Sequence, residues 1–423
     1  NYSSDDPYTY YQYAQALYKS GETNSAINEF RNLQQKFPDS KYAESALFTV
    51  GFIKFQEGEF EDAIADFRYV LQIYKKSALA PVVFYSIGDA YFNLGMYDSA
   101  IVNYRNVLTK YPSSEYAFDA INGMQYSYVA SGKSDEAINL IDRYTSQNPN
   151  TKFSDQIFFK KGEIYYSQRD YQNAKTSYQE FLVRYPKSAF VPEAYYWLGK
   201  SSQNLKQDDE AIFYFNKVFE SYPGSESAAV SVIELGKIYE TNGNFQASID
   251  LLEKASSKLK DSPRLPEVLF IKGSAYIRAD NVQKAYGTFE ELAMYRREDI
   301  FADRAKFEMG VIDMATGRYE VADKNFLEVA EKRTDDIGAR SQYYYGLSLF
   351  DQGKYSESIS ALVRVRTVYS QYEPWLSRSY LLLGDCYVKL NDKRQAEEMY
   401  RIVVTKHKGN ELGEEARQKI NKL

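Results

Sequence analysis

The sequence of 423 residues contains one cysteine, one histidine and two tryptophans. A single cysteine, Cys386, excludes an intramolecular disulfide and leaves the redox compartment undecided. A single histidine, His407, leaves no set of histidine and cysteine ligands for a structural zinc ion. No glycine-rich phosphate loop or nucleophile elbow is present either. We therefore expect no catalytic residue, no metal site and no cofactor, and we expect the chain not to be an enzyme.

The chain also lacks a long apolar run and a strong charge of one sign. The most apolar candidate, residues 77–87, contains Pro81, so we expect no membrane span in this chain. The net charge is −6, and 52 basic residues are mixed with 58 acidic ones along the sequence. Because no basic half exists to hold a phosphate backbone, nucleic acid is not an expected partner.

The lone cysteine and the lone histidine both have structural explanations. Cys386 lies in LLLGDCYVKL, an apolar stretch that predicts a buried helix, where a thiol acts as a small core residue. His407 lies in the polar stretch TKHKGN, which predicts a solvent-exposed imidazole.

A regular repeat dominates what the chain does contain. Small residues recur every 37 residues, with intervals of 36 and 38 near the end. They are Ala26, Ala63, Ala100, Ala137, Ala174, Ala211, Ser248, Ala285, Ala322, Ser358 and Ala396. A second ladder lies twelve residues upstream: Gly51, Gly88, Gly162, Gly199, Gly236, Gly273, Gly310, Gly346 and Gly384. Two ladders in fixed phase indicate one unit copied about eleven times, and such an array builds a long surface rather than one catalytic pocket.

One unit, residues 81–113, predicts two helices. Apolar residues recur at steps of three and four before Gly95 and again after it, until Pro112 ends the second run. Ser113 and Ser114 are then candidate N-caps for the next helix. Neither helix can bury its apolar stripe alone, so we expect helical hairpins that stack on one another.

The glycine ladder predicts close approach between neighbouring helices. Glycine inside a helix costs roughly 1 kcal/mol relative to alanine, so its recurrence at one internal position needs a packing reason. Gln125 and Ala14 replace the glycine in the fourth and first units, where we expect different packing.

These hairpin units resemble tetratricopeptide repeats. The resemblance is carried by FYSIGDAYFNLGMYDSAIVNYRNVLTKYP at residues 84–112 and YYWLGKSSQNLKQDDEAIFYFNKVFESYP at residues 195–223. HEAT and armadillo units are longer and lack the paired small-residue ladders. The resemblance implies an all-α, right-handed α-solenoid (superhelix) of about eleven helix–turn–helix repeats over residues 8–410. A polar lead, residues 1–7, would precede it, and a capping helix, residues 411–423, would follow it.

The units are three residues longer than the usual 34, and the extra residues follow the proline, as in RYPKSAFVPEAYYWLG at 184–199. This connection is similar to that of bacterial cell-envelope repeats, such as the outer-membrane assembly lipoprotein and Tol-Pal accessory proteins. The resemblance implies a non-enzymatic scaffold for partner proteins in a cell-envelope complex. It implies a periplasmic or outer-membrane location in a Gram-negative bacterium, while a cytoplasmic location stays open.

The two ends of the array differ in sequence. At the carboxyl end we expect Ala416 and Ile420 to cover the last hairpin, while Glu414, Glu415, Arg417 and Lys419 face water. At the amino end, tyrosines crowd the first helix with nothing before them to pack on. We expect either that more protein precedes Asn1 or that this end meets a partner, which can be another protein or another copy.

Aromatic residues recur at the fifth, ninth and twelfth positions of the first helices. In the tetratricopeptide family these helices line the concave face, which gives a candidate groove. Its residues are Tyr11, Phe48, Phe52, Tyr85, Phe92, Tyr126, Phe159, Tyr166, Tyr196, Phe270, Phe307 and Tyr343. The rings either fill the space between successive helices or line a groove for an extended peptide, a helix or a glycan.

A candidate basic row lies near the carboxyl end. Arg304, Arg340 and Arg378 occupy the second position of the last three units and can take an acidic segment if they share a face. Alternatively they are solvated or paired with Glu308, Asp303 or Asp385. The lysine and asparagine that clamp a terminal carboxylate in chaperone-binding tetratricopeptide domains are absent at the corresponding positions. The leading hypothesis is a protein scaffold, and the alternatives are a scaffold for polysaccharide export or synthesis and a self-assembling array.

Overall fold

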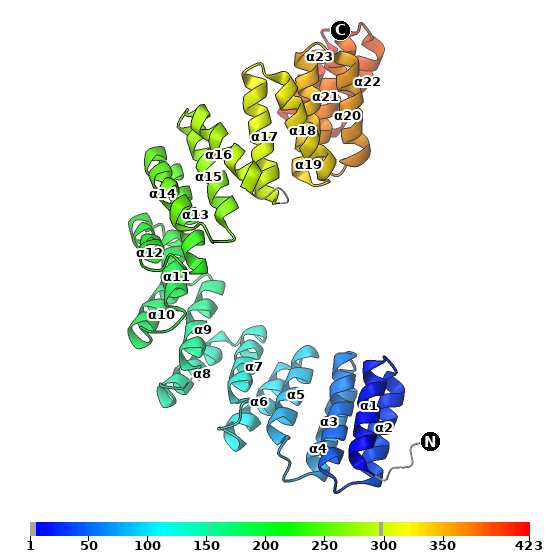
Figure 1. Cartoon of the computed structure of the whole chain (residues 1–423), viewed down its shortest axis with the longest axis vertical. Helices are drawn as coiled ribbons and strands as arrows, with labels where there is room; N and C mark the ends of the chain where they lie inside the picture. Colours follow the sequence, from blue (N-terminus) through cyan, green and yellow to red (C-terminus); the bar gives the residue numbers. More distant parts are fainter. Residues whose placement is uncertain (1–5, 152, 296–298) are drawn as a thin grey trace. The chain divides into compact units, whose positions relative to one another are not determined.

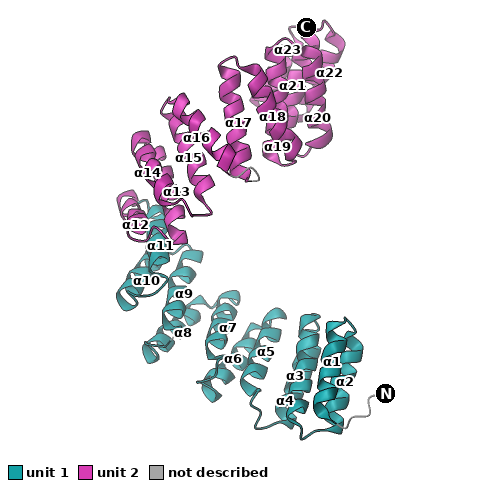
Figure 2. Cartoon of the chain, viewed as in Figure 1, with its two compact units in different colours: residues 1–206 teal, residues 207–423 magenta. Residues whose placement is uncertain are grey.

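A computed structural model describes residues 6–151, 153–295 and 299–423, and these residues form helices and turns without a strand (Figure 1). They group into two compact units, residues 1–206 and residues 207–423 (Figure 2). The expected all-α fold of stacked helical hairpins is confirmed. Residues 1–5 of the predicted polar lead lie outside the described residues.

Unit 1 consists of five consecutive helix pairs and one further helix. The pairs are α1 (Pro7–Lys19) and α2 (Thr23–Lys36), α3 (Lys41–Gln56) and α4 (Phe60–Ile73), α5 (Ala80–Asn93) and α6 (Tyr97–Lys110), α7 (Ala117–Ala130) and α8 (Ser134–Gln147), and α9 (Ser154–Ser167) and α10 (Tyr171–Arg184); α11 (Val191–Asn204) follows.

Unit 2 begins with α12 (Asp208–Ser221), continues with five pairs and ends with a single helix. The pairs are α13 (Glu226–Thr241) and α14 (Phe245–Lys258), α15 (Leu265–Arg278) and α16 (Val282–Tyr295), α17 (Ile300–Ala315) and α18 (Tyr319–Lys332), α19 (Asp336–Asp351) and α20 (Tyr355–Val368), and α21 (Glu373–Lys389) and α22 (Lys393–Lys406); α23 (Glu411–Ile420) is the last.

A residue in the left-handed region makes the tight turn within a pair. Gly58, Gly95 and Gly132 have φ values of 81°, 70° and 74°, a region that glycine enters without steric cost. Gly95 therefore ends α5 where the sequence predicts the interruption. Arg169 takes the same place between α9 and α10 with a φ of 63°, which shows that the turn tolerates a side chain at a cost.

The N-cap prediction at Ser113 and Ser114 is wrong. Helix α7 begins only at Ala117, and no side chain caps it. The Ser114 hydroxyl oxygen instead accepts the Tyr116 N–H at 3.1 Å, within an extra turn that the longer connection forms.

At most ladder positions an aromatic ring of the second helix faces the glycine, whereas Leu362 faces Gly346. A Cβ atom placed on Gly88 would lie 2.5 Å from the Tyr104 ring, and one on Gly384 would lie 2.3 Å from the Tyr400 ring. The facing residue is sixteen positions later in each case. The expected close approach of helices is therefore confirmed, and the ring of the second helix is what requires it. At Gly236, by contrast, nothing lies nearer than 3.7 Å.

Within each unit the odd-numbered helices form one layer and the even-numbered helices the other (Figure 1). Neighbouring odd-numbered helices approach each other directly, as α1 does α3 and α19 does α21. The odd-numbered layer is thus the more tightly stacked side, which in a curved repeat array is the inner one. The candidate groove residues and the candidate basic row both lie on this layer.

The last helix covers part of the core of unit 2. Ala416 is fully buried in a cluster with Tyr400 and Val403, and Ile420 packs against it, as expected. Lys419 does not simply face water, because its ammonium binds the Asp385 carboxylate at 2.7 Å and 2.8 Å. This ion pair joins α23 to α21 and stabilises the packing of α23 on the core of unit 2.

Candidate functional site

Several fifth-position rings of the first helices touch rings from two other elements. The Tyr85 ring centroid lies 5.7 Å from that of Tyr104 on α6 and 6.0 Å from that of Tyr116 before α7. In unit 2, Phe270 lies 5.8 Å from Phe289 and 5.9 Å from Phe301. These rings therefore join the two helices of a pair and the start of the next pair.

Burial divides the candidate groove residues into three groups. Phe159 and Phe307 are 3% and 0% exposed, so they offer no surface to a ligand in this conformation. Phe52 and Tyr126 are 42% and 54% exposed. The half-buried ones are Tyr11, Phe48, Tyr85, Phe92, Tyr166, Tyr196, Phe270 and Tyr343. Packing between helices accounts for the buried sides of these rings, and any groove must use the exposed edges.

The twelfth-position rings pack against the turn inside their own pair. Phe92 meets Tyr97, the first residue of α6, at 5.4 Å, and Tyr166 meets Tyr171, the first residue of α10, at 5.2 Å. The Tyr166 hydroxyl also accepts the Asn204 amide N–H at 3.0 Å. These two rings therefore brace the hairpin as well as bordering the inner layer.

A partly buried carboxylate, that of Asp89, lies beside the rings of the third pair. The Tyr104 hydroxyl donates to Asp89 Oδ1 at 2.6 Å. Burial raises the pKa of Asp89, hydrogen bonds from Tyr104 and Tyr85 oppose that rise, and Asp119 adds to it. The sequence carries a signal for this contact, because an acid directly follows the ladder glycine where the facing ring is tyrosine, as Asp89 follows Gly88.

The three arginines of the candidate basic row lie on α17, α19 and α21 over aromatic rings. Arg304 lies 5.3 Å from the Phe301 ring centroid, and Arg378 lies 5.7 Å from that of Trp375. Arg340 lies 4.1 Å from the buried Phe307 ring. Sequence reasoning did not identify Trp375, whose ring lies near both Arg340 and Arg378.

Only one of the three acids proposed as partners pairs with the row. Glu308 lies 3.9 Å from Arg340, while burial raises the pKa of Glu308 and Arg340 opposes that rise. Asp303 instead binds Lys332 at 2.9 Å, and Asp385 binds Lys419.

Two cavities border the row. One of about 350 Å³ is lined by Phe270, Arg304, Glu308 and Arg340 among others. The other, of about 900 Å³, is lined by residues of α19, α21, the connection before α23, and α23 itself. They include Tyr343, Leu347, Arg378, Leu381, His407 and Glu411. The cavities give the inner layer of unit 2 recesses that are lined by both apolar and charged side chains.

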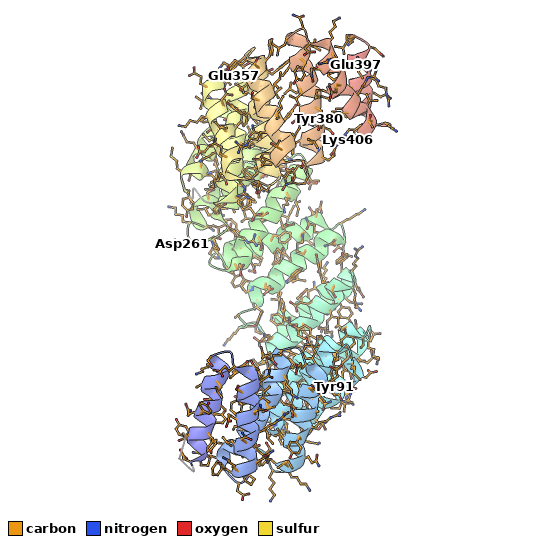
Figure 3. All side chains as sticks on the ribbon, turned by 90° about the vertical axis from the view of Figure 1, so that its right-hand side faces the viewer. Tyr91, Asp261, Glu357, Tyr380, Glu397 and Lys406 are labelled. Atoms are coloured by element: carbon orange, nitrogen blue, oxygen red, sulfur yellow. The ribbon has the colours of Figure 1, made fainter. Side chains whose placement is uncertain are left out.

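The expectation of a solvent-exposed histidine is wrong. The His407 imidazole is 18% exposed, with its Nε2 atom 2.8 Å from the Ser377 hydroxyl and its Nδ1 atom 3.0 Å from the Asn410 amide. Beside it, the Glu373 carboxylate binds Lys406, labelled in Figure 3, at 3.0 Å. The ring thus connects α21 to the segment before α23.

Cys386 is fully buried, as the sequence predicts, and its thiol lies 3.3 Å from the Ser358 hydroxyl. Burial raises the pKa of Cys386 to about 11, so the thiolate is disfavoured near neutral pH. Across residues 6–151, 153–295 and 299–423 we find no group of three or more histidine, cysteine, aspartate or glutamate side chains placed to hold a metal ion. Nor does any helix in that part of the chain have both the length and the apolar character needed to cross a membrane.

Family comparisons match several separate stretches of the chain. Three models described as tetratricopeptide repeat match residues 8–40, 156–188 and 193–225, residues 307–366, and residues 339–401. A model described as outer membrane lipoprotein matches residues 77–165. Among curated proteins, tetratricopeptide repeat protein 37 of Xenopus laevis is 21% identical over 219 residues. That match covers 50% of this chain but only 14% of the relative's length.

Solved structures of repeat proteins are also similar. A tetratricopeptide repeat protein from Parabacteroides merdae is 15% identical, with a TM-score of 0.36, and the match covers 63% of this chain and 98% of that one. The C-terminal part of a repeat-containing protein from Cytophaga hutchinsonii is 17% identical, with a TM-score of 0.43, and the match covers 61% of this chain and 99% of that one. The chain therefore belongs to the tetratricopeptide repeat family, as shown by the family matches in both halves of the sequence, the two small-residue ladders and the paired helices.

Proposed function

We propose that this protein is a non-enzymatic scaffold of a bacterial cell-envelope complex, which binds partner proteins along its layer of odd-numbered helices. Tetratricopeptide repeats are protein-interaction modules, and proteins built from them are generally not enzymes. The envelope location is supported by the outer membrane lipoprotein model that matches residues 77–165. The length of the array supports binding of extended partner segments rather than small molecules.

The observation that carries the proposal is the pair of exposed rings on the odd-numbered layer of unit 1. Phe52 on α3 stacks on Phe48 with centroids 6.5 Å apart, and it leaves much of its own surface in water. Tyr126 on α7 is exposed in the same way and keeps a polar hydroxyl at its tip. Large rings supply contact area with little side-chain entropy to lose, which suits them to anchor a partner.

The experiment is recovery of partners from a cell-envelope extract by the chain and by the variant Phe52→Ala/Tyr126→Ala. The matched control is Tyr69→Ala/Val102→Ala, which removes comparably exposed side chains from α4 and α6 in the other layer. We expect the first variant to lose partners that the control retains. Equal recovery by both variants would remove the odd-numbered layer of unit 1 as the binding face.

Polysaccharide binding is the alternative, because an exposed tyrosine or phenylalanine ring can also stack on a sugar. Tryptophan and tyrosine fluorescence during titration with envelope polysaccharides separates the two functions. A fluorescence response that the Phe52→Ala/Tyr126→Ala variant loses would favour the glycan.

A further inference from the structure

We propose that α17, α19 and α21 bind an extended acidic segment of a partner protein, with Arg304, Arg340 and Arg378 contacting its side-chain carboxylates. This proposal rests on the scaffold function and specifies the chemistry of one partner segment. It concerns unit 2 alone.

Two of the three arginines in the row carry positive charge that no described carboxylate pairs with. Arg304 and Arg378 are exposed, and no carboxylate of the described residues lies within ion-pair distance of either guanidinium. Each is held over a ring, which fixes the guanidinium plane while its N–H donors stay free for a ligand. A planar donor set of this kind suits a carboxylate, which it can bind through two parallel hydrogen bonds.

Four acids along the row accept hydrogen bonds or ion pairs from other residues of the chain. Asp336 accepts the Trp375 indole N–H at 2.9 Å, and Asp335 binds the Arg333 Nε atom at 3.0 Å. Farther along, Glu373 binds Lys406 and Asp385 binds Lys419.

Arg340 is the central member of the row and shares its charge with Glu308 at 3.9 Å. An acidic ligand therefore competes with one internal acid at Arg340, whereas it meets free cations at Arg304 and Arg378. At α23 the larger cavity is lined by the acids Glu411 and Glu415, so the proposed contacts are confined to α17, α19 and α21.

The spacing of the helices also suits an extended segment. Packed helices lie about 8–10 Å apart, and an extended chain advances about 3.3 Å per residue. A segment that crosses α17, α19 and α21 would therefore meet a new arginine about every third residue. The cavities of about 350 Å³ and 900 Å³ beside the row provide room for the side chains between the acids.

Trp375 provides a built-in reporter of binding. Its ring lies 5.7 Å from both Arg340 and Arg378, and Trp197 is the other tryptophan in the sequence. In a Trp197→Phe background the tryptophan fluorescence comes from Trp375 alone. The probe is a synthetic peptide with glutamate at every third position and with both ends blocked, so that no terminal carboxylate takes part.

We expect this peptide to change the Trp375 fluorescence with saturation, and its glutamine analogue to give no change. Arg304→Gln/Arg378→Gln should weaken binding about tenfold for each arginine removed. Arg340 stays unchanged in this variant, because it packs against the buried Phe307 ring. The matched control, Arg401→Gln, removes an exposed arginine from α22 and should leave the affinity unchanged.

The proposal is overturned if the double variant binds the peptide as tightly as the parent while its melting temperature is unchanged, or if the glutamine analogue binds equally well. A peptide with three adjacent glutamates that binds better than the spaced one would also overturn it. Failure of the scaffold function gives a different pattern, in which the peptide binds but the full chain recovers no partner from the envelope extract.

Discussion

At the scale of single residues, the type of ring that packs on a ladder glycine correlates with the residue that directly follows the glycine. Tyr104 and Tyr400 each donate to the acid one position after the glycine, Asp89 at 2.6 Å and Asp385 at 2.7 Å. Where the facing ring is phenylalanine, that position carries no acid. At these two positions the contact has a physical reason, since a buried hydroxyl needs an acceptor and a buried carboxylate needs a donor. Tyr178 differs: it faces Gly162, which Glu163 follows, but its buried hydroxyl has no hydrogen-bond partner among the described residues.

Asp89 gives a prediction about pH. Its folded-state pKa is raised, chiefly by burial, so the folded protein holds this proton more tightly than the unfolded chain does. Stability from this group is therefore fully present below the unfolded-state pKa and is lost as the pH rises through the folded-state pKa. We expect Asp89→Asn to be more stable than the parent at pH 7, on the order of 1 kcal/mol, and to show a smaller gain at pH 4. Urea unfolding at both pH values measures this.

The control for Asp89 is Asp98→Asn, which changes an exposed carboxylate that pairs with Lys133. It should show no gain at pH 7. If Asp89→Asn proved less stable than the parent at pH 7, the hydrogen bonds that the charged carboxylate accepts from Tyr104 and Tyr85 would stabilise the fold by more than the burial of its charge costs.

At the scale of the element, the ladder glycines give a matched pair of substitutions. Gly88→Ala places a methyl group 2.5 Å from Tyr104, so the ring must move, and we expect a loss of about 1–3 kcal/mol. Gly236→Ala places its methyl group inside a helix at ordinary van der Waals distance, 3.7 Å from its nearest neighbours, and we expect a gain of up to about 1 kcal/mol. Thermal and urea unfolding compare the two variants, and equal losses would refute the role given to the rings.

The sequence predicts these elements well because their signals are local. Apolar periodicity places α5 and α6, and Gly95 and Pro112 mark their ends, without knowledge of any distant residue. Ser114 shows where local signals fail, since the same hydroxyl can cap a helix or a turn, and the length of the connection decides between them.

The candidate site was less predictable, because exposure depends on the next helix pair. Phe159 and Tyr126 both occupy first-helix positions, yet one is buried by Tyr178 and Phe190 and the other is exposed. Similarly, the polar sequence around Lys419 and His407 predicts that both face solvent. In the structure Lys419 binds Asp385 and His407 contacts Ser377, both on α21. These outcomes follow from contacts between units of the repeat, which no single unit encodes.

At the scale of the whole molecule, stability is a sum of contributions from each repeat and from its contacts with neighbouring repeats. A terminal repeat has only one neighbour, so one of its apolar faces needs a covering element. Helix α23 covers a cluster that contains Leu381, Tyr400 and Val403, and its Ala416 is buried there. The outward side of α23 carries Glu414 and other charged residues, which discourages the stacking of a second copy.

Removal of residues 411–423 tests this role of α23. The deletion exposes the cluster and leaves Asp385 without Lys419, so we expect concentration-dependent association through the uncovered face and a lower melting temperature. Light scattering over a concentration series measures the association. Lys422→Ala, which changes only an exposed charge beyond the helix, is the control and should scatter as the parent does. If the truncated chain shows neither concentration-dependent scattering nor a lower melting temperature, the α21–α22 hairpin is stable without α23. The charged residues of α23 would then not be needed to prevent association of further copies.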